Sequence, residues 1–286
     1  MNFIKAKNIG SIILSSGFAF LLIRSFITYN GRSDNPKQES RIEHLVLFRF
    51  KNTITLQEKE DIINRFMALK NSLKDGKHYM KIEYGFQKSR GVKKGNYDVG
   101  FRVTFNSMED RDYYVGKIEG QPVPVRYDHM HDAFKNFVSP YLDIDDLETK
   151  GILVFDYVSN EKGDRSVPDN GYRLHQWTLF KLKAGVSQTQ KQEIINFFLA
   201  LKNNIKNKMS YIEHIEYGEQ NSKEGLNRGF ELIFRVSFNS KIDRDYYNSH
   251  SFLSQIGILD PNYIKYKDCI FPFLDEVLVY DYEVKR

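Results

Sequence analysis

The feature that most constrains this chain is an internal repeat. Four blocks of sequence occur twice, in the same order and at a separation of 132 or 133 residues. The paired blocks are 62–71 with 194–203, 83–85 with 216–218, 101–107 with 234–240, and 110–114 with 243–247. Self-similarity at a fixed spacing is the signature of one structural unit present more than once. The sequence therefore predicts the same domain twice in one chain.

The length of 286 residues suits two such domains, each large enough to bury its own core. A polar segment rich in Gly, Pro and Asp, SNEKGDRSVPDNG, separates the two copies. The expected organisation is a leader and tether over 1–40, a first domain over 41–158, a linker over 159–171 and a second domain over 172–286.

Each copy has the pattern strand, helix, strand, strand, helices, strand. In the first copy, Thr55 and Glu58 have the spacing of a capping box before a helix. The helix is expected to bury a stripe at i, i+4, i+7 and i+11, formed by Ile62, Phe66, Leu69 and Leu73. The expected strands are 42–50, 79–86, 97–105 and 152–158, then 211–218, 229–238 and 276–284 in the second copy. This order predicts an α+β, ferredoxin-like βαββαβ unit, with helices on one face of an antiparallel sheet.

The uncovered face of each sheet would expose a large apolar surface, which soluble proteins rarely do. Two copies in one chain can cover each other. We therefore expect the two sheets to pair within the chain as an internal pseudo-dimer.

The first copy also carries a set of short motifs in a fixed order. They are His44 to Lys51, Glu83-Tyr84-Gly85, Val103 to Phe105, Arg111 to Tyr114, and Val154 to Tyr157. As a set they resemble the stress-responsive dimeric α/β-barrel (Dabb) family, over nearly all of 41–158 and 172–284. The resemblance implies ferredoxin-like units whose sheets pair into a barrel. The predicted fold is thus two tandem units forming an intrachain dimeric α/β barrel, preceded by an N-terminal hydrophobic helix.

The resemblance also implies a candidate site. A plant polyketide cyclase of this family uses a Tyr and a His in a pocket between the sheet and the helices. His131 matches its His, Tyr113 matches its Tyr, and His44 matches a His of the first strand. The residues expected to line the pocket for a ligand are Val46, Phe48, Phe50, Tyr114 and Phe134. Independently, a His transfers protons near neutral pH, and a Tyr hydroxyl can polarise a carbonyl group.

The second copy departs from this pattern. Counting back from Lys183 places Gln176 opposite His44, whereas His175 lies one step earlier, and Tyr263 stands where the first copy has His131. A shift of one residue in a strand turns a side chain to the other face. The second copy is therefore expected to lack the chemistry of the first.

Three functions remain open at this stage. The chain is expected to be a module that binds a small apolar molecule, with a polyketide-cyclase-like lyase or cyclase using Tyr113 and His131 as the first alternative. The second alternative is a non-catalytic structural or partner-interaction protein, for which the insertion 116–127 would be the surface to mutate. No cofactor is implied. No metal site is expected, because His129 and His131 would diverge on a helix.

The formal charge of +5 is concentrated at the N-terminus, where residues 1–40 hold five basic and two acidic residues. The remainder mixes both signs and lacks the focused basic field that nucleic-acid binding requires. No nucleic-acid partner is therefore expected.

Residues 8–23 carry no charge and follow Lys5 and Lys7, which is typical of an export signal or a membrane anchor. We expect residues 9–29 to contact a membrane, so the protein is expected to be membrane-anchored or secreted. A cleaved signal, an organellar presequence and a buried helix remain alternatives.

Overall fold

A computed structural model describes residues 41–88, 96–147, 149–159, 174–248 and 269–284. The expected membrane segment 9–29, most of the linker and Tyr263 lie outside these residues. Among the residues described, no helix is both long and apolar enough to cross a membrane. Membrane attachment therefore stays a prediction.

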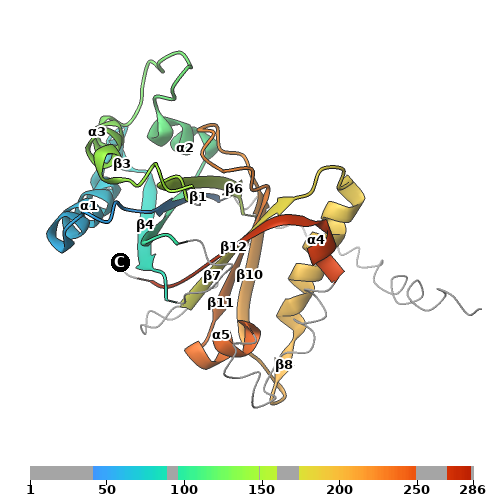
Figure 1. The fold of residues 1–286 in the computed structure, drawn as a ribbon. Helices are drawn as coiled ribbons and strands as arrows, with labels where there is room; N and C mark the ends of the chain where they lie inside the picture. The colour runs from blue at the N-terminus through green and yellow to red at the C-terminus, as the bar shows by residue number, and fades with distance from the viewer. Residues whose placement is uncertain (1–40, 89–95, 148, 160–173, 249–268, 285–286) are drawn as a thin grey trace, which may run out of the picture. The chain divides into compact units, whose positions relative to one another are not determined.

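The described residues belong to one compact unit, in which the predicted order of elements occurs twice (Figure 1). The first half contains β1 Ile42–Phe48, α1 Leu56–Ala68, β2 Leu73–Lys74, β3 Lys77–His78, β4 Met80–Phe86, β5 Val99–Phe105, α2 Met108–Val115, α3 His129–Val138 and β6 Ile152–Val158. The second half contains β7 Leu174–Leu182, α4 Gln188–Ala200, β8 Ile205–Lys206, β9 Met209–Ser210, β10 Ile212–Glu219, β11 Leu232–Phe238, α5 Lys241–Asn248 and β12 Leu274–Glu283. Short 3-10 turns are Leu69–Asn71, Ser139–Tyr141, Leu201–Asn203 and Phe271–Phe273.

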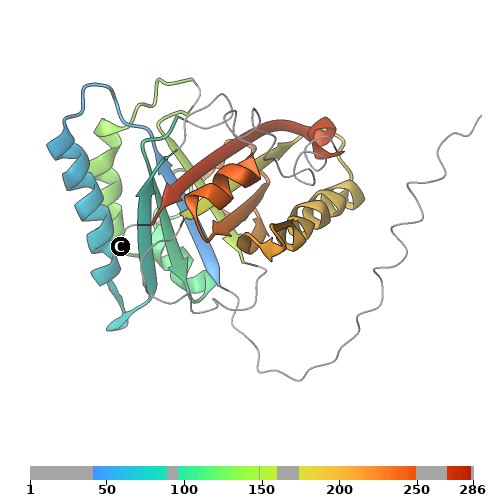
Figure 2. The ribbon, with the colours of Figure 1, turned by 90° about the horizontal axis from the view of Figure 1, so that it is seen from below.

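Each half has a four-stranded antiparallel sheet with the same strand order. The orders are β4-β5-β1-β6 and β10-β11-β7-β12, so the first strand of each half is central and pairs with the last. Helices α1 and α3 lie along one face of the first sheet, as Figure 2 shows. The ferredoxin-like prediction is confirmed for both halves.

The first helix begins and packs largely as its sequence predicts. Thr55 caps α1 in a full capping box with Glu58, and Ile62, Phe66 and Leu69 are buried. The expected burial of Leu73 is wrong. The helix ends in a 3-10 turn at Asn71, and Leu73 then lies in the short hairpin β2–β3 with 48% of its surface exposed.

The second face of each sheet packs against the other half, as predicted. The strand residues that alternate with the helix-facing ones form a separate apolar cluster between the sheets. Its strand members are Leu45, Leu47, Leu153, Phe155 and Tyr157 from the first half, and Trp177, Leu179, Ile233, Leu278, Tyr280 and Tyr282 from the second. The two sheets therefore form one intrachain α/β barrel.

Hydrogen bonds join the sheet edges at two matching seams. At one seam Lys88 N donates to Asp281 O at 2.9 Å, and at the other Asn221 N donates to Asp156 O at 2.9 Å. At each seam a Tyr of one half lies against a glycine of the other. A Cβ built on Gly85 would lie 2.6 Å from Tyr282, and one built on Gly218 would lie within 2.5 Å of Tyr157. Only glycine lets the sheets approach this closely.

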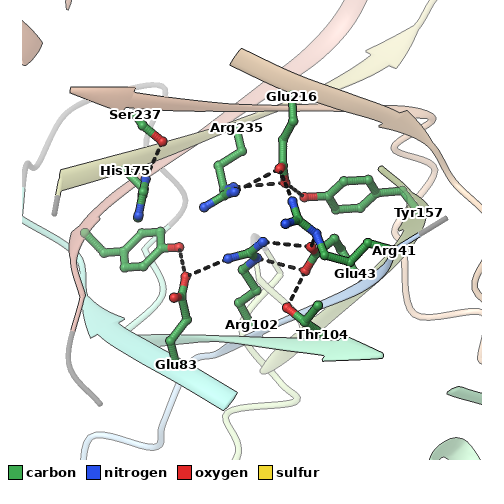
Figure 3. A network of polar contacts seen from close by, with 11 residues as sticks. Arg41, Glu43, Glu83, Arg102, Thr104, Tyr157, His175, Glu216, Arg235 and Ser237 are labelled. Atoms are coloured by element: carbon green, nitrogen blue, oxygen red, sulfur yellow. Dashed lines mark hydrogen bonds and ion pairs between the residues drawn. The ribbon is translucent and has the colours of Figure 1, made fainter. Parts of the chain in front are cut away.

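Charged side chains between the sheets compensate one another (Figure 3). Arg102 donates two hydrogen bonds to Glu43, at 2.8 and 2.7 Å, and Arg235 donates two to Glu216, at 2.9 and 2.8 Å. The halves are cross-linked because Tyr157 donates to Glu216 at 2.6 Å. Buried charges are tolerated when paired in this way.

Candidate functional site

His44 lies on the helix-facing side of β1, directly opposite Asp156 of β6. Its Nδ1 lies 2.6 Å from Asp156 Oδ1, and both side chains are buried. A carboxylate at Nδ1 fixes the orientation of the ring and leaves Nε2 for proton exchange. His44 therefore has the geometry of an acid–base residue.

Arg111 of α2 completes this cluster. Its Nη1 donates to the second carboxylate oxygen of Asp156 at 2.5 Å, and its Nε donates to Asp112 at 2.7 Å. Nη2 of Arg111 is buried and has no hydrogen-bond partner among the described residues. Asp156 thus binds two cationic groups, and one of them keeps a donor unused.

These contacts shift the protonation of the pair in opposite directions. Burial lowers the pKa of His44, but the carboxylate of Asp156 outweighs burial, so the pKa is raised above its ordinary value of 6.5. Burial raises the pKa of Asp156, but His44 and Arg111 together hold it below its ordinary value. The charged form of the pair is therefore favoured near neutral pH.

Tyr114 of α2 lies between the two histidines. The ring centroids of Tyr114 and His131 are 3.7 Å apart and stacked, and those of Tyr114 and His44 are 5.5 Å apart and edge-on. The buried hydroxyl of Tyr114 has no hydrogen-bond partner among the described residues. The structure thus brings His44 and His131 together around Tyr114. The preceding residue of the helix, Tyr113, does not lie between them.

His131 is placed by the start of α3. Asp128 caps this helix, because its Oδ1 accepts from Met130 N at 2.8 Å and from His131 N at 3.1 Å. The ring Nδ1 of His131 lies 2.6 Å from the carbonyl oxygen of Tyr114. Burial lowers the pKa of His131 well below its ordinary value, and Lys135 and His44 lower it further. His131 is therefore neutral at pH 7.

The remaining expected ligand residues lie in the core of the first half. They pack among rings of α1, β5 and α3; Phe48, for example, contacts Phe66 and Phe101 at centroid distances of 6.0 and 5.5 Å. These core residues are Val46, Phe48, Phe50 and Phe134. Their role toward a ligand stays a prediction.

A pocket of about 340 Å³ opens on the outer side of α2. Tyr113 lines it, but His44 and His131 do not. The lining residues are Lys74, Glu109, Arg111, Asp112, Tyr113, Val115, Gly116, Ile118, Gln121, Pro124, Arg126 and Lys223. Arg111 connects this pocket to the buried histidine cluster, because it lines the pocket and its guanidinium also contacts Asp156.

The second half contributes a segment to this site. Residues 220–226 follow β10 and lie along β6: Asp156 N donates to Gln220 Oε1 at 3.2 Å, and Val154 N donates to Leu226 O at 3.1 Å. Lys223 of this segment lines the pocket and pairs with Asp112 at 3.0 Å. The site is therefore built from both halves.

The matching place in the second half lacks the histidine. In the strand register, Gln176 lies opposite Asp281, as His44 lies opposite Asp156. His175 lies on the barrel side instead, where its Nδ1 is 2.7 Å from Ser237 Oγ. The expected register is confirmed. The Arg–Asp pair is kept there as Arg244 and Asp281.

Three site residues were not found from the sequence: Asp156, Arg111 as its partner, and Glu224 of the segment 220–226. A signal existed for the first two. Asp156 and Asp281 interrupt the apolar closing strands of both copies, and Arg111 and Arg244 stand in the repeated DRDYY block. Glu224 lies in the other half, so sequence proximity gave no such signal.

The profile of the stress responsive A/B barrel domain matches residues 42–159 and 174–284 of this chain. No curated protein sequence matches it.

Several solved structures are similar. A crystal structure of an anthrone oxidase-like protein covers 87% of this chain and 93% of its own, with 12% identity and a TM-score of 0.54. A putative monooxygenase from Fusobacterium nucleatum subsp. nucleatum covers 86% of this chain and 93% of its own, with 8% identity and a TM-score of 0.53. A protein from Arabidopsis thaliana is 27% identical over 38% of this chain and 92% of its own, with a TM-score of 0.32. The first two likenesses establish a shared fold.

Proposed function

This chain belongs to the stress responsive A/B barrel domain family, and from that premise we propose that its first half binds a small molecule in the pocket beside α2. The observation that carries the proposal is the pocket itself, whose volume of about 340 Å³ lies in the range of small-molecule sites. Tyr113, Ile118 and Pro124 line it, and Arg111 is among the other lining residues.

The lining suggests the kind of ligand. A guanidinium presents a planar fork of donors that suits a carboxylate or a carbonyl oxygen. Arg111 retains a buried donor, Nη2, without a partner among the described residues. We therefore propose a ligand with an apolar body and an acceptor head, such as a carboxylic acid or a ketone.

Thermal stabilisation by octanoate and benzoate tests this, with octan-1-ol as the probe that lacks the carboxylate. A ligand that binds only the folded state raises the melting temperature by an amount that grows with the ratio of its concentration to its dissociation constant. Both acids are expected to raise it more than the alcohol does. Ile118→Trp fills the pocket and is expected to abolish the shift. Ile242→Trp is the control, because Ile242 is 68% exposed on α5. The proposal fails if no probe shifts the melting temperature, or if Ile118→Trp leaves the shift intact.

A second candidate is acid–base turnover of an apolar carbonyl compound, of the cyclase or lyase type. The pairing of His44 with Asp156 at 2.6 Å favours it, because a carboxylate-oriented imidazole is a common general acid or base. His44→Gln copies the residue that the second half carries at position 176, so the fold should tolerate it. Turnover of a polyketide-like ketone should be abolished by His44→Gln and by His131→Gln. Activity retained in both variants would exclude this candidate.

A further inference from the structure

Glu224 is a second-half residue whose electrostatic surroundings belong to the first half. The charges that act on it are those of His44 on β1, Asp156 on β6, Lys135 on α3 and Arg111 on α2. Its Oε2 is buried and has no hydrogen-bond partner among the described residues. A buried carboxyl oxygen without a partner is uncommon and calls for a reason, such as a ligand or a proton-transfer role.

The segment that carries Glu224 is held firmly in place on both sides. Before Glu224, Asn221 N donates to Asp156 O at 2.9 Å and Lys223 pairs with Asp112 at 3.0 Å. After it, Leu226 accepts from Val154 N at 3.1 Å and packs against the core of the first half. The segment that carries Glu224 is therefore fixed against β6 and α2 by the pairing of the two halves.

The duplication supplies an independent argument. The blocks on either side of this segment, 83–85 with 216–218 and 101–107 with 234–240, are both separated by 133 residues, so position 224 corresponds to position 91 without a gap. Position 91 is Gly, and the corresponding position to His44 in the second half is Gln176. The histidine and the acid thus occur together in the first site, and neither of the two corresponding positions in the chain carries such a residue.

We propose that Glu224 is a charge partner of the buried pair His44–Asp156, so that the second half completes the site of the first half. The unused hydroxyl of Tyr114 and the unused Nη2 of Arg111 belong to the same cluster. Of these groups, Arg111 also lines the pocket beside α2, which connects the cluster to the proposed ligand site. A role of Glu224 toward a ligand rests on the proposed function of this site. The two experiments below do not depend on that function.

The supporting electrostatics are consistent in direction. Burial raises the pKa of Glu224, and His44 and Lys135 oppose that rise. The ionised carboxylate of Glu224 raises the pKa of His44, in addition to the larger effect of Asp156. Ionisable groups that interact strongly titrate as a pair, with apparent pKa values that belong to both.

The test is to follow the His44 imidazole by NMR titration of the full chain without ligand, in the wild type, in Glu224→Gln and in Glu219→Gln. Glu219 precedes the same segment but is exposed, which makes it a matched control. We expect the midpoint of His44 to fall in Glu224→Gln, because a nearby negative charge is lost, and to stay in Glu219→Gln. An unchanged midpoint in both variants would overturn the proposal.

A double-mutant cycle gives a second reading that does not depend on assigning the histidine signal. The pH dependence of the melting temperature between about pH 5 and pH 8, where histidines titrate, is compared for Glu224→Gly in the wild type and in His44→Gln. Glu224→Gly copies the residue at position 91 and removes the carboxyl group. The variant should change the pH dependence by a different amount when His44 is present than when it is absent, and equal effects in both backgrounds would refute the pairing. Neither measurement uses octanoate, so failure of the binding proposal and failure of this one are distinguishable.

Discussion

The two halves have the same strand order but differ in the side chains around a buried aspartate. In the first half the buried Asp156 binds both Arg111 and His44, whereas in the second half Asp281 pairs with Arg244 and its strand neighbour is Gln176. Gln176 is satisfied locally, because its Oε1 accepts from Asn248 at 2.8 Å. The pair of Arg and Asp is thus common to both halves and belongs to the fold. The histidine is specific to the first half, which is where a chemical role is expected.

The largest effect should come from removing the shared carboxylate. Asp156→Ala leaves two buried cationic groups uncompensated, and breaking such a pair costs about 3–5 kcal/mol of unfolding free energy. Asp281→Ala leaves only Arg244 and should cost less. Urea denaturation of both variants measures the difference. Equal losses of unfolding free energy would mean that the contact of Asp156 with His44 adds nothing to stability.

The seams should respond equally in the two halves, unlike the site. Gly85→Ala and Gly218→Ala each place a methyl group against a Tyr of the opposite half, at 2.6 Å or less. Overpacking of this kind costs about 1–3 kcal/mol. Thermal unfolding of the two variants is expected to show similar losses. A clear difference between the two losses would show that the two seams are packed differently although their hydrogen bonds match.

The pH dependence of stability should separate the halves further. The pKa of His44 is raised in the folded state, so its contribution is complete below pH 6.5 and is lost as the pH rises through the folded pKa. His44→Gln should therefore cost most stability at acidic pH, about 1.5 kcal/mol for a hydrogen bond to a charged group, and less at alkaline pH. Denaturation curves at several pH values check the sign. A cost that grows with pH would contradict it.

The smallest effect is expected at the solvent-exposed contact between the halves. Lys223→Gln removes an ion pair with Asp112 whose side chains are 56% and 44% exposed, and such pairs contribute less than about 1 kcal/mol. Lys241→Gln, at a surface pair within α5, is the control. Both losses should vanish in high salt. A larger, salt-resistant loss for Lys223→Gln would indicate that the segment 220–226 depends on this contact.

Much of the fold was predictable because its signals are local and occur twice. Short-range patterns predicted the capping box at Thr55, the buried stripe from Ile62 to Leu69 and the register of Gln176, and one copy could be checked against the other. The error at Leu73 arose because the periodic pattern continues past the residue at which the helix ends. Periodicity does not define where a helix ends.

The site was predicted only in part, because it depends on contacts between distant segments. The sequence identified His44 and His131, but it favoured Tyr113 over Tyr114, and neighbouring residues of a helix are separated by about 100° of rotation. The contact of Asp156 with His44 spans 112 residues. The place of Glu224 depends on how the two halves pair. No local pattern carries that information.

The covalent joining of the two halves has a consequence for how such a protein can change over time. In a barrel made of two identical chains, symmetry places every substitution on both sides, so a gain at one site is tied to the same change at the other. Here each seam always joins the same two partners, for example Gly218 to Tyr157 and never to a second copy of its own half. The second half can then specialise in covering the site while the first half keeps the histidine. Exchange of subunits cannot reverse this difference between the halves.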